Sequence, residues 1–269
     1  MVHVRHIKKP PGLRALVTAF VLMPMAIAAE PQGIYYGASA TMQQAEIEYK
    51  KSVRSLFRDN EGRTDTQETS ANVEEKPLQW DGLLGYRLNF AEGTQFFAIQ
   101  LEASLLGDDV SGRLGGEGES ASQNLFGEAW PEDWSLETSR TLGVVTKYGI
   151  SRALLQAIDI SLYGLVGVRQ TTIDFFSSSF GCFQAIGCDV NEFRTNTQSL
   201  DPEVNLVVAG VGIETGLTNK AALQFEVRYV QDFKSEWLTE FEDSGQEVSV
   251  PSGLTIESTD LTVKLIRYL

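Results

Sequence analysis

Nine charged residues lie on the polar faces of predicted strands, whose opposite faces are apolar. Their types determine which chemistry they could support. Five are basic and four are acidic, so their charges nearly cancel. They are Arg87, Glu102, Lys147, Asp159, Arg169, Glu214, Glu226, Arg228 and Lys264. Carboxylates beside cations can form ion pairs, line a path for small solutes, or act as general acids and bases. Because proximity alone does not make a catalytic pair, we predict a structural network of ion pairs, with a narrow polar path as the alternative.

Histidine is confined to the first residues of the chain, as His3 and His6. If that segment is removed, no histidine remains to activate a nucleophilic serine or to bind zinc. We therefore predict that the protein is not an enzyme and holds no cofactor and no metal.

Two cysteines, Cys182 and Cys188, lie close together in the chain. In an exported protein, this spacing predicts a local disulfide at the tip of a loop. A redox-active pair is the alternative, although no neighbouring base is apparent that would lower the pKa of a thiol.

Residues 1–29 have the pattern of a secretory signal peptide. Four basic residues, Arg5, Lys8, Lys9 and Arg14, flank or begin an apolar stretch over 13–25, and small residues follow at 26–29. The apolar stretch is too short to span a membrane as a helix. We predict cleavage after Ala28 or Ala29, which leaves one barrel domain over 30–269; an uncleaved anchor is the alternative.

The charge balance argues against nucleic acid as a partner. The full chain has 22 basic and 36 acidic residues, and removal of the four basic residues of the signal gives 18 − 36 = −18. A chain of this charge repels nucleic acid and does not bind anionic lipid by simple attraction. The acidic stretches 107–136 and 234–254 predict a hydrated surface, with weak divalent-cation binding as the alternative.

Eight segments with alternating apolar and polar residues are expected to position these side chains. They are 34–44, 80–90, 95–106, 141–150, 157–172, 203–215, 221–233 and 255–269. Such alternation is typical of strands with one apolar face. In the first segment the apolar set changes phase after Met42 and continues through Ala45, Ile47 and Tyr49, which predicts a bulge. A helix over 42–57 is the alternative there.

The connections alternate in length. Three are short, at 91–94, 151–156 and 217–220, and four are long, at 50–79, 107–136, 173–202 and 234–254. An up-and-down barrel places all short connections at one rim and all long ones at the other, as transmembrane barrels do. The fold class we predict is all-β, an eight-stranded antiparallel up-and-down transmembrane β-barrel, with 261–269 paired to 34–42. Ten strands remain an alternative, because 50–79 could contain a further hairpin.

Aromatic residues near the strand ends fit two girdles at the membrane interfaces. Tyr36, Phe90, Phe97 and Tyr148 fall at the short-connection rim, and Trp80, Tyr229, Phe233 and Trp237 at the other. Within the second long connection, Phe126, Trp130 and Trp134 either contact a partner or lipid, or pack against their own loop.

The opening Gly33–Ser39, the asymmetry of the connections and the terminal strand resemble those of small outer-membrane β-barrel proteins of the eight-stranded, OmpA/OmpX-like type. The chain departs from that pattern at its end, where Leu269 replaces the usual aromatic residue and Arg267 interrupts the apolar row. The resemblance implies the outer membrane of a Gram-negative bacterium. It also implies lipid, lipopolysaccharide and the barrel assembly machinery as partners.

The function expected from these features is structural, or surface interaction through four long acidic extracellular loops, with no partner identified. A narrow pore for small solutes is one alternative. A soluble, exported ligand-binding barrel of the lipocalin type is the other, and in that fold the apolar face points inward.

Overall fold

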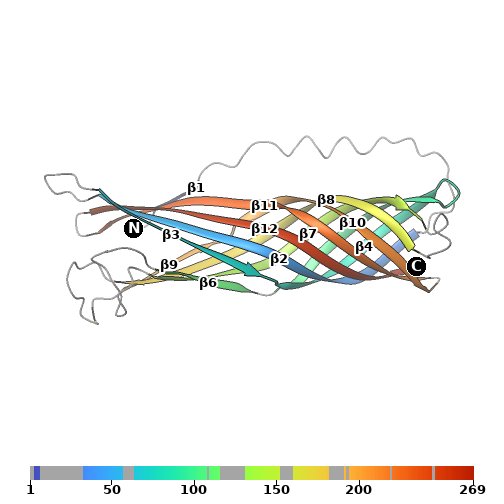
Figure 1. Ribbon diagram of the computed structural model, residues 1–269, viewed down its shortest axis with the longest axis horizontal. Coiled ribbons are helices and arrows are strands. Elements are labelled where there is room, and N and C mark those ends of the chain that lie inside the picture. Colours follow the sequence, from blue (N-terminus) through green and yellow to red (C-terminus); the bar gives the residue numbers. More distant parts are fainter. Residues whose placement is uncertain are drawn as a thin grey trace.

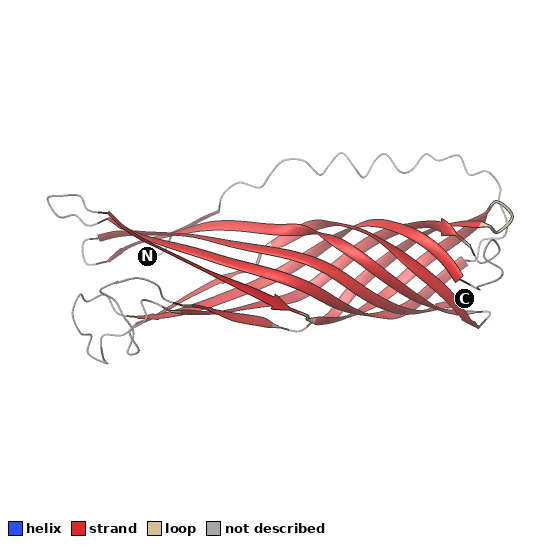
Figure 2. Cartoon of the chain, in the orientation of Figure 1, coloured by secondary structure: helices blue, strands red, loops and turns tan. Residues whose placement is uncertain are grey.

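The computed structural model describes residues 3–6, 33–56, 64–107, 109–115, 131–151, 160–181, 191, 194–218, 220–243 and 246–269. These residues are almost entirely β-strand (Figure 2). Among them, no helix is long and apolar enough to cross a membrane.

Eight strands pair in a closed antiparallel ring (Figure 1). In ring order they are β2 (Gly33–Leu56), β4 (Leu78–Phe90), β5 (Gln95–Gly107), β7 (Glu132–Ile150), β8 (Ile160–Gly181), β10 (Glu203–Thr218), β11 (Ala221–Asp243) and β12 (Gln246–Tyr268), which returns to β2. The chain is an eight-stranded β-barrel. The predicted fold class and strand number are confirmed.

The first and last ring strands close the barrel as predicted. Leu261 lies opposite Met42 and Tyr268 opposite Tyr35, with every intermediate pair in register. The N–H of Leu269 donates to the carbonyl oxygen of Ile34 at 3.0 Å. The terminal strand therefore has a partner along its whole length and leaves no free edge in the ring.

A tight turn joins β4 to β5 at the short-connection rim. Ala91, Glu92 and Gly93 have φ values of 51°, 57° and 81°, in the left-handed region. The N–H of Gly93 donates to the oxygen of Phe90 at 3.1 Å, and the Thr94 hydroxyl donates to the oxygen of Ala91 at 2.7 Å. The C-terminus lies at the same end of the barrel (Figure 1).

At the opposite end the strands continue well beyond the ring, and we call this part the extension. Three shorter strands complete it: β3 (Thr64–Glu75) beside β2, β6 (Val110–Leu114) beside β7, and β9 (Arg194–Leu200) beside β8. A fourth, β1 (His3–His6), pairs with β11 between Trp237 and Glu240. Much of what the sequence predicts as long loops is therefore sheet. β3 precedes β4 in line, separated by Lys76 and Pro77, so it does not raise the strand number of the ring to ten.

In β2 the inward residues become more apolar from the ring to the extension, although the strand keeps the same face inward. In β2 the buried odd-numbered residues are Tyr35, Ser39 and Thr41 in the ring, then Ala45, Ile47 and Tyr49 in the extension. The ladders of β2 with β3, β4 and β12 have no register shift in this region. The predicted bulge is therefore wrong, and so is the alternative helix. The apolar set changes phase because apolar residues face outward in the ring and inward in the extension.

The ladders shift register at four other places in the described residues, and two of these bulges, in β7 and β11, reorient side chains of the extension. The register shifts between Thr138 and Arg140, and between Val230 and Phe233. Each shift moves the residues beyond it to the other face of the sheet. Phe233 and Trp237 consequently point inward and are only 5% and 3% exposed, so their predicted place in an outer aromatic girdle is wrong.

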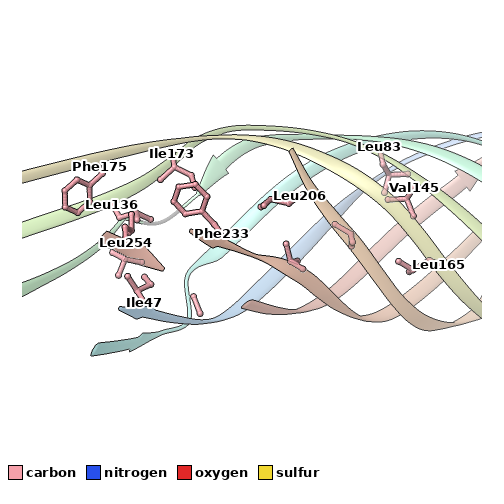
Figure 3. Close-up of a cluster of buried hydrophobic side chains, with 14 of the residues drawn as sticks. Ile47, Leu83, Leu136, Val145, Leu165, Ile173, Phe175, Leu206, Phe233 and Leu254 are labelled. Carbon is pink, nitrogen blue, oxygen red and sulfur yellow. The ribbon is translucent and has the colours of Figure 1, made fainter. Parts of the chain in front are cut away.

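The extension encloses an apolar core. Figure 3 shows Ile47, Leu136, Ile173, Phe175 and Leu254 gathered there, while Leu165 lies further down the ring. These side chains come from four different strands, so packing ties the strands of the extension together where backbone pairing is incomplete.

Candidate functional site

The interior of the ring holds a network of ion pairs, and Glu226 is at its centre. Its carboxylate accepts from Lys147 Nζ at 2.7 Å, from Arg228 Nη2 at 2.5 Å and from Lys264 Nζ at 3.0 Å. The hydroxyl of Tyr163 donates to the same carboxylate at 2.8 Å. Glu226 and its three cationic partners are almost completely buried, so each charge depends on the others for compensation.

Glu102 forms a second centre beside the first. Both of its oxygens accept from the Arg228 guanidinium, at 2.7 and 2.6 Å, which is the strong bidentate geometry. Lys264 and Gln100 donate to it at 2.5 Å each. Arg228 and Lys264 therefore link the two carboxylates into one unit.

Toward the short-connection rim, Arg87 pairs with Glu214 at 2.8 Å. The guanidinium carbon of Arg87 also lies 3.7 Å from the centre of the Phe96 ring. Gln224 joins this pair to the central cluster, because it donates to Glu214 and accepts from Lys147, both at 2.8 Å. Glycine makes room for the rings that bound the cluster: a side chain at Gly212 would overlap the ring of Tyr163.

Toward the extension, Arg169 pairs with Asp260 at 2.9 Å. Nearby, the carboxylate of Asp81 accepts hydrogen bonds from Ser39 at 3.0 Å, Thr41 at 3.2 Å and Gln79 at 2.5 Å. Sequence reasoning missed both aspartates. Asp260 shares the alternation of Thr262 and Lys264 and was recognisable from it, whereas Asp81 sits where the ladder of β4 with β5 shifts by one residue.

Of the nine predicted charged residues, Asp159 lies outside the described residues, seven belong to the connected network, and Arg169 forms a separate pair with Asp260. With Asp81 and Asp260 added, the five basic residues face five acidic ones. Such a balanced, hydrogen-bonded cluster is suited to fill the interior of an eight-stranded barrel. Within the described part of the chain, no group of three metal-ligating residues could hold a metal ion.

A small cavity of about 50 Å³ separates the ion-pair network from the apolar core of the extension. Polar residues of the ring, including Arg169, Gln43 and Gln79, line one side, and Ile47, Leu136 and other apolar residues line the other. Two buried polar atoms close by, Arg169 Nε and Asp260 Oδ1, have no protein partner. The cavity has room for one or a few water molecules that could satisfy them.

The extension contains a cluster of four aromatic rings. Tyr49 lies 5.1 Å from Phe175, 6.2 Å from Trp134 and 6.0 Å from Trp237, measured between ring centres. The Tyr49 hydroxyl donates to Glu132 Oε1 at 2.6 Å, and Lys51 forms an ion pair with the same carboxylate. Burial, and then the Glu132 carboxylate, raise the pKa of Tyr49, so its phenol stays protonated and remains a donor.

Trp134 is not a surface contact residue. Its side chain is 2% exposed and packs against Tyr49 and Phe175, which come from other strands, rather than against its own loop. The bulge in β7 is the reason, because it turns Trp134 inward. The other two aromatic candidates, Phe126 and Trp130, lie outside the described residues, as do Cys182 and Cys188, whose disulfide stays a prediction.

No family model and no curated protein matches the chain. Among solved structures, it is similar to the outer membrane protein AlkL in lipid bilayers, with 15% identity over 92% of this chain and 95% of that one, at a TM-score of 0.36. It is also similar to the outer membrane protein OprG of Pseudomonas aeruginosa (12% identity, 87% and 99% covered, TM-score 0.31). A third is the attachment invasion locus protein Ail of Yersinia pestis (13% identity, 83% and 98% covered, TM-score 0.26). The fold of this chain is established by its own strand ladders.

Proposed function

We propose that this protein is a non-enzymatic barrel of a Gram-negative outer membrane, with a closed lumen and a projecting extension that serves surface interaction. The observation that carries the proposal is the reversal of polarity along single strands. Apolar residues face outward in the ring and inward in the extension, so the outer face changes from apolar to polar along the barrel axis.

The outer face of the ring is suited to lipid. It forms a belt of exposed large apolar side chains that includes Leu84 on β4, Leu101 on β5, Val166 on β8, Val211 on β10 and Leu265 on β12. Exposed aromatic residues are found toward its margins, with Tyr36 and Tyr148 near the short connections and Trp80 and Tyr229 near the extension. An apolar band between aromatic girdles is the pattern of transmembrane barrels.

A soluble lipocalin-like barrel requires the opposite arrangement, with apolar residues inside and polar residues outside the ring. Here the ring interior holds a cluster of charged side chains, and exposed large apolar side chains come from all eight ring strands. This argues against the soluble alternative.

Fractionation of cells that express the full chain tests the membrane placement. We expect the protein in the outer-membrane fraction, with faster migration on unheated than on heated denaturing gels, because a closed ring of ladders resists detergent until heated. Recovery of folded protein in the periplasmic soluble fraction would refute the placement. The predicted loss of residues 1–29 is checked on the same sample by N-terminal sequencing.

The buried ion pairs also argue that the lumen does not conduct. Glu226, Lys147 and Lys264 are essentially inaccessible to solvent, and Arg228 and Glu102 lie directly beside them. We expect purified, heat-modifiable protein to produce no ion currents in planar bilayers. Reproducible unitary currents from such a preparation would instead support the narrow pore, and a general porin in the same bilayer is the positive control.

Lipid and lipopolysaccharide are the proposed surroundings of the belt, and the barrel assembly machinery is the proposed partner during insertion. A surface role is supported by the length of the extension, since β2, β11 and β12 all continue far past the ring. A barrel that served only to fill the membrane would not need strands of 23 or 24 residues.

A further inference from the structure

Within the described residues, the extension consists of two lobes that share no backbone ladder. One lobe is the sheet β6–β7–β8–β9, and the other is the sheet β3–β2–β12–β11. No ladder joins β3 to β6 or β9 to β11, and the lobes diverge toward the far end of the extension (Figure 1). The outer edge of β11 pairs with β1, which belongs to the segment predicted to be removed. The ring below is closed by ladders on every side, so the lobes could separate while the ring stays intact.

Side chains make the polar contacts between the lobes within the described residues. At one seam the Thr69 hydroxyl donates to the oxygen of Gly115 at 2.9 Å, and at the other Gln198 Nε2 donates to the Thr239 hydroxyl at 2.8 Å. Between them, Glu132 on one lobe binds Tyr49 and Lys51 on the other. Each of these contacts involves at least one side chain, and side chains reorient far more readily than a ladder of backbone hydrogen bonds separates.

The aromatic cluster lies on the plane between the lobes. Tyr49 and Trp237 belong to one lobe, and Trp134 and Phe175 to the other. The contacts across the plane are Tyr49 with Phe175 and with Trp134, and Phe175 with Trp237 at 5.5 Å. Separation of the lobes would therefore expose two facing aromatic walls.

Two donors in these walls have no partner. Trp134 Nε1 and Trp237 Nε1 are buried and make no hydrogen bond, one in each lobe. Buried donors are normally paired, and a core built only for stability has no use for an indole N–H that it cannot satisfy. Opening would also free Glu132 and the Tyr49 hydroxyl, which now satisfy each other across the plane.

We propose that the two lobes form a clamp that opens along its seams and binds a neutral saccharide between the aromatic walls. The apolar face of a sugar ring packs on aromatic rings, its oxygens accept from the two indole N–H groups, and its hydroxyls donate to Glu132. A purely apolar ligand would leave both indole donors unpaired. The carboxylate and the strongly acidic chain disfavour a sulfated or phosphorylated sugar. The clamp proposal depends on the proposed function in one respect only, namely which side of the membrane the clamp faces.

Calorimetry and tryptophan fluorescence on the folded protein in lipid vesicles test the clamp, with maltotriose and triacetylchitotriose as probes. A phosphate-free core oligosaccharide from bacterial lipopolysaccharide and a neutral animal-type glycan then distinguish a sugar of the same membrane from one of another cell. We expect saturable binding of at least one neutral sugar. If a heat-modifiable barrel binds no sugar, or binds only an apolar dye, the clamp proposal is overturned and the proposed function stays intact. Binding by protein that is not inserted in a membrane would count against the proposed function instead.

Two variants separate a clamp from a plain core. Thr69→Cys with Gly115→Cys should lock one seam when oxidised, abolish binding, and regain it on reduction, with reduced wild type as the control.

Trp237→Phe keeps an aromatic ring but removes its hydrogen-bond donor, and should weaken binding about three- to tenfold without loss of folding. Trp80→Phe, on the exposed belt, should change nothing. Equal binding by the oxidised locked form, or by Trp237→Phe, would overturn the proposal.

Discussion

Replacement of Glu226 by glutamine is expected to lower the free energy of unfolding by about 3–5 kcal/mol. The substitution keeps the shape and the hydrogen-bond acceptor that Tyr163 uses, but removes the charge that Lys147, Arg228 and Lys264 share. Those three cations are nearly inaccessible to water, so the uncompensated charge cannot be hydrated without disruption of the ring. Urea unfolding in lipid vesicles, followed by tryptophan fluorescence, measures the loss.

The matched control is Glu48→Gln on the outer face of the extension. Glu48 pairs with Lys50 at 2.7 Å, but the two side chains are 33% and 61% exposed. Surface pairs of this kind contribute about 0–1 kcal/mol, so the control should change stability little. If the two variants lose the same free energy of unfolding, the lumen network is hydrated and its ion pairs do not stabilise the fold. The double variant Lys147→Met with Glu226→Gln should recover part of the loss, because it removes one charge of each sign.

An arginine in place of Val211 is expected to destabilise the inserted barrel by about 2–4 kcal/mol. Val211 is 64% exposed on the outer face of β10 and is flanked along the strand by Ala209 and Ile213. In a bilayer that position lies among acyl chains, and the guanidinium must either lose its hydration or thin the membrane locally. Reversible folding in vesicles of defined thickness gives the free-energy difference.

Ser70→Arg on β3 provides the comparison. Ser70 is exposed on the outer face of the extension, where water is expected to surround it, so the same new side chain should have almost no effect. Equal and small effects of the two arginines would mean that the belt does not contact lipid. The two variants thus test the reversal of polarity directly, because one places an arginine against the proposed lipid and the other places it in water.

The ring was predictable because its signal is local. Alternation along each segment, together with the even number of segments and the pattern of short connections, was sufficient to predict the pairing of Leu261 with Met42 and its neighbours. Eight of the nine inward charges followed from the same alternation, since in this region polar residues face in and apolar residues face out.

The extension was not predictable in the same way. The sequence of β9, from Arg194 to Leu200, has almost no apolar residues, and β3 is polar on its outer face with only small residues such as Ala71 and Val73 inside. Both resemble loops because their pairing comes from tertiary context. The orientation of Trp134 and Phe233 depends on single extra residues in β7 and β11. Alternation of apolar and polar residues cannot reveal such a bulge where the apolar residues also change from the outer to the inner face of the barrel.

The two bulges have a consequence for how such a chain can evolve. In β7 and β11 they set the strand phase of the extension apart from that of the ring, so these strands can gain or lose residues before Thr138 or after Phe233 without reorienting the lipid-facing side chains. Length changes in paired strands, two residues at a time, would leave the membrane part unaltered. The extension is thereby a module on which selection can act separately, while the ring stays constrained by the bilayer that surrounds it.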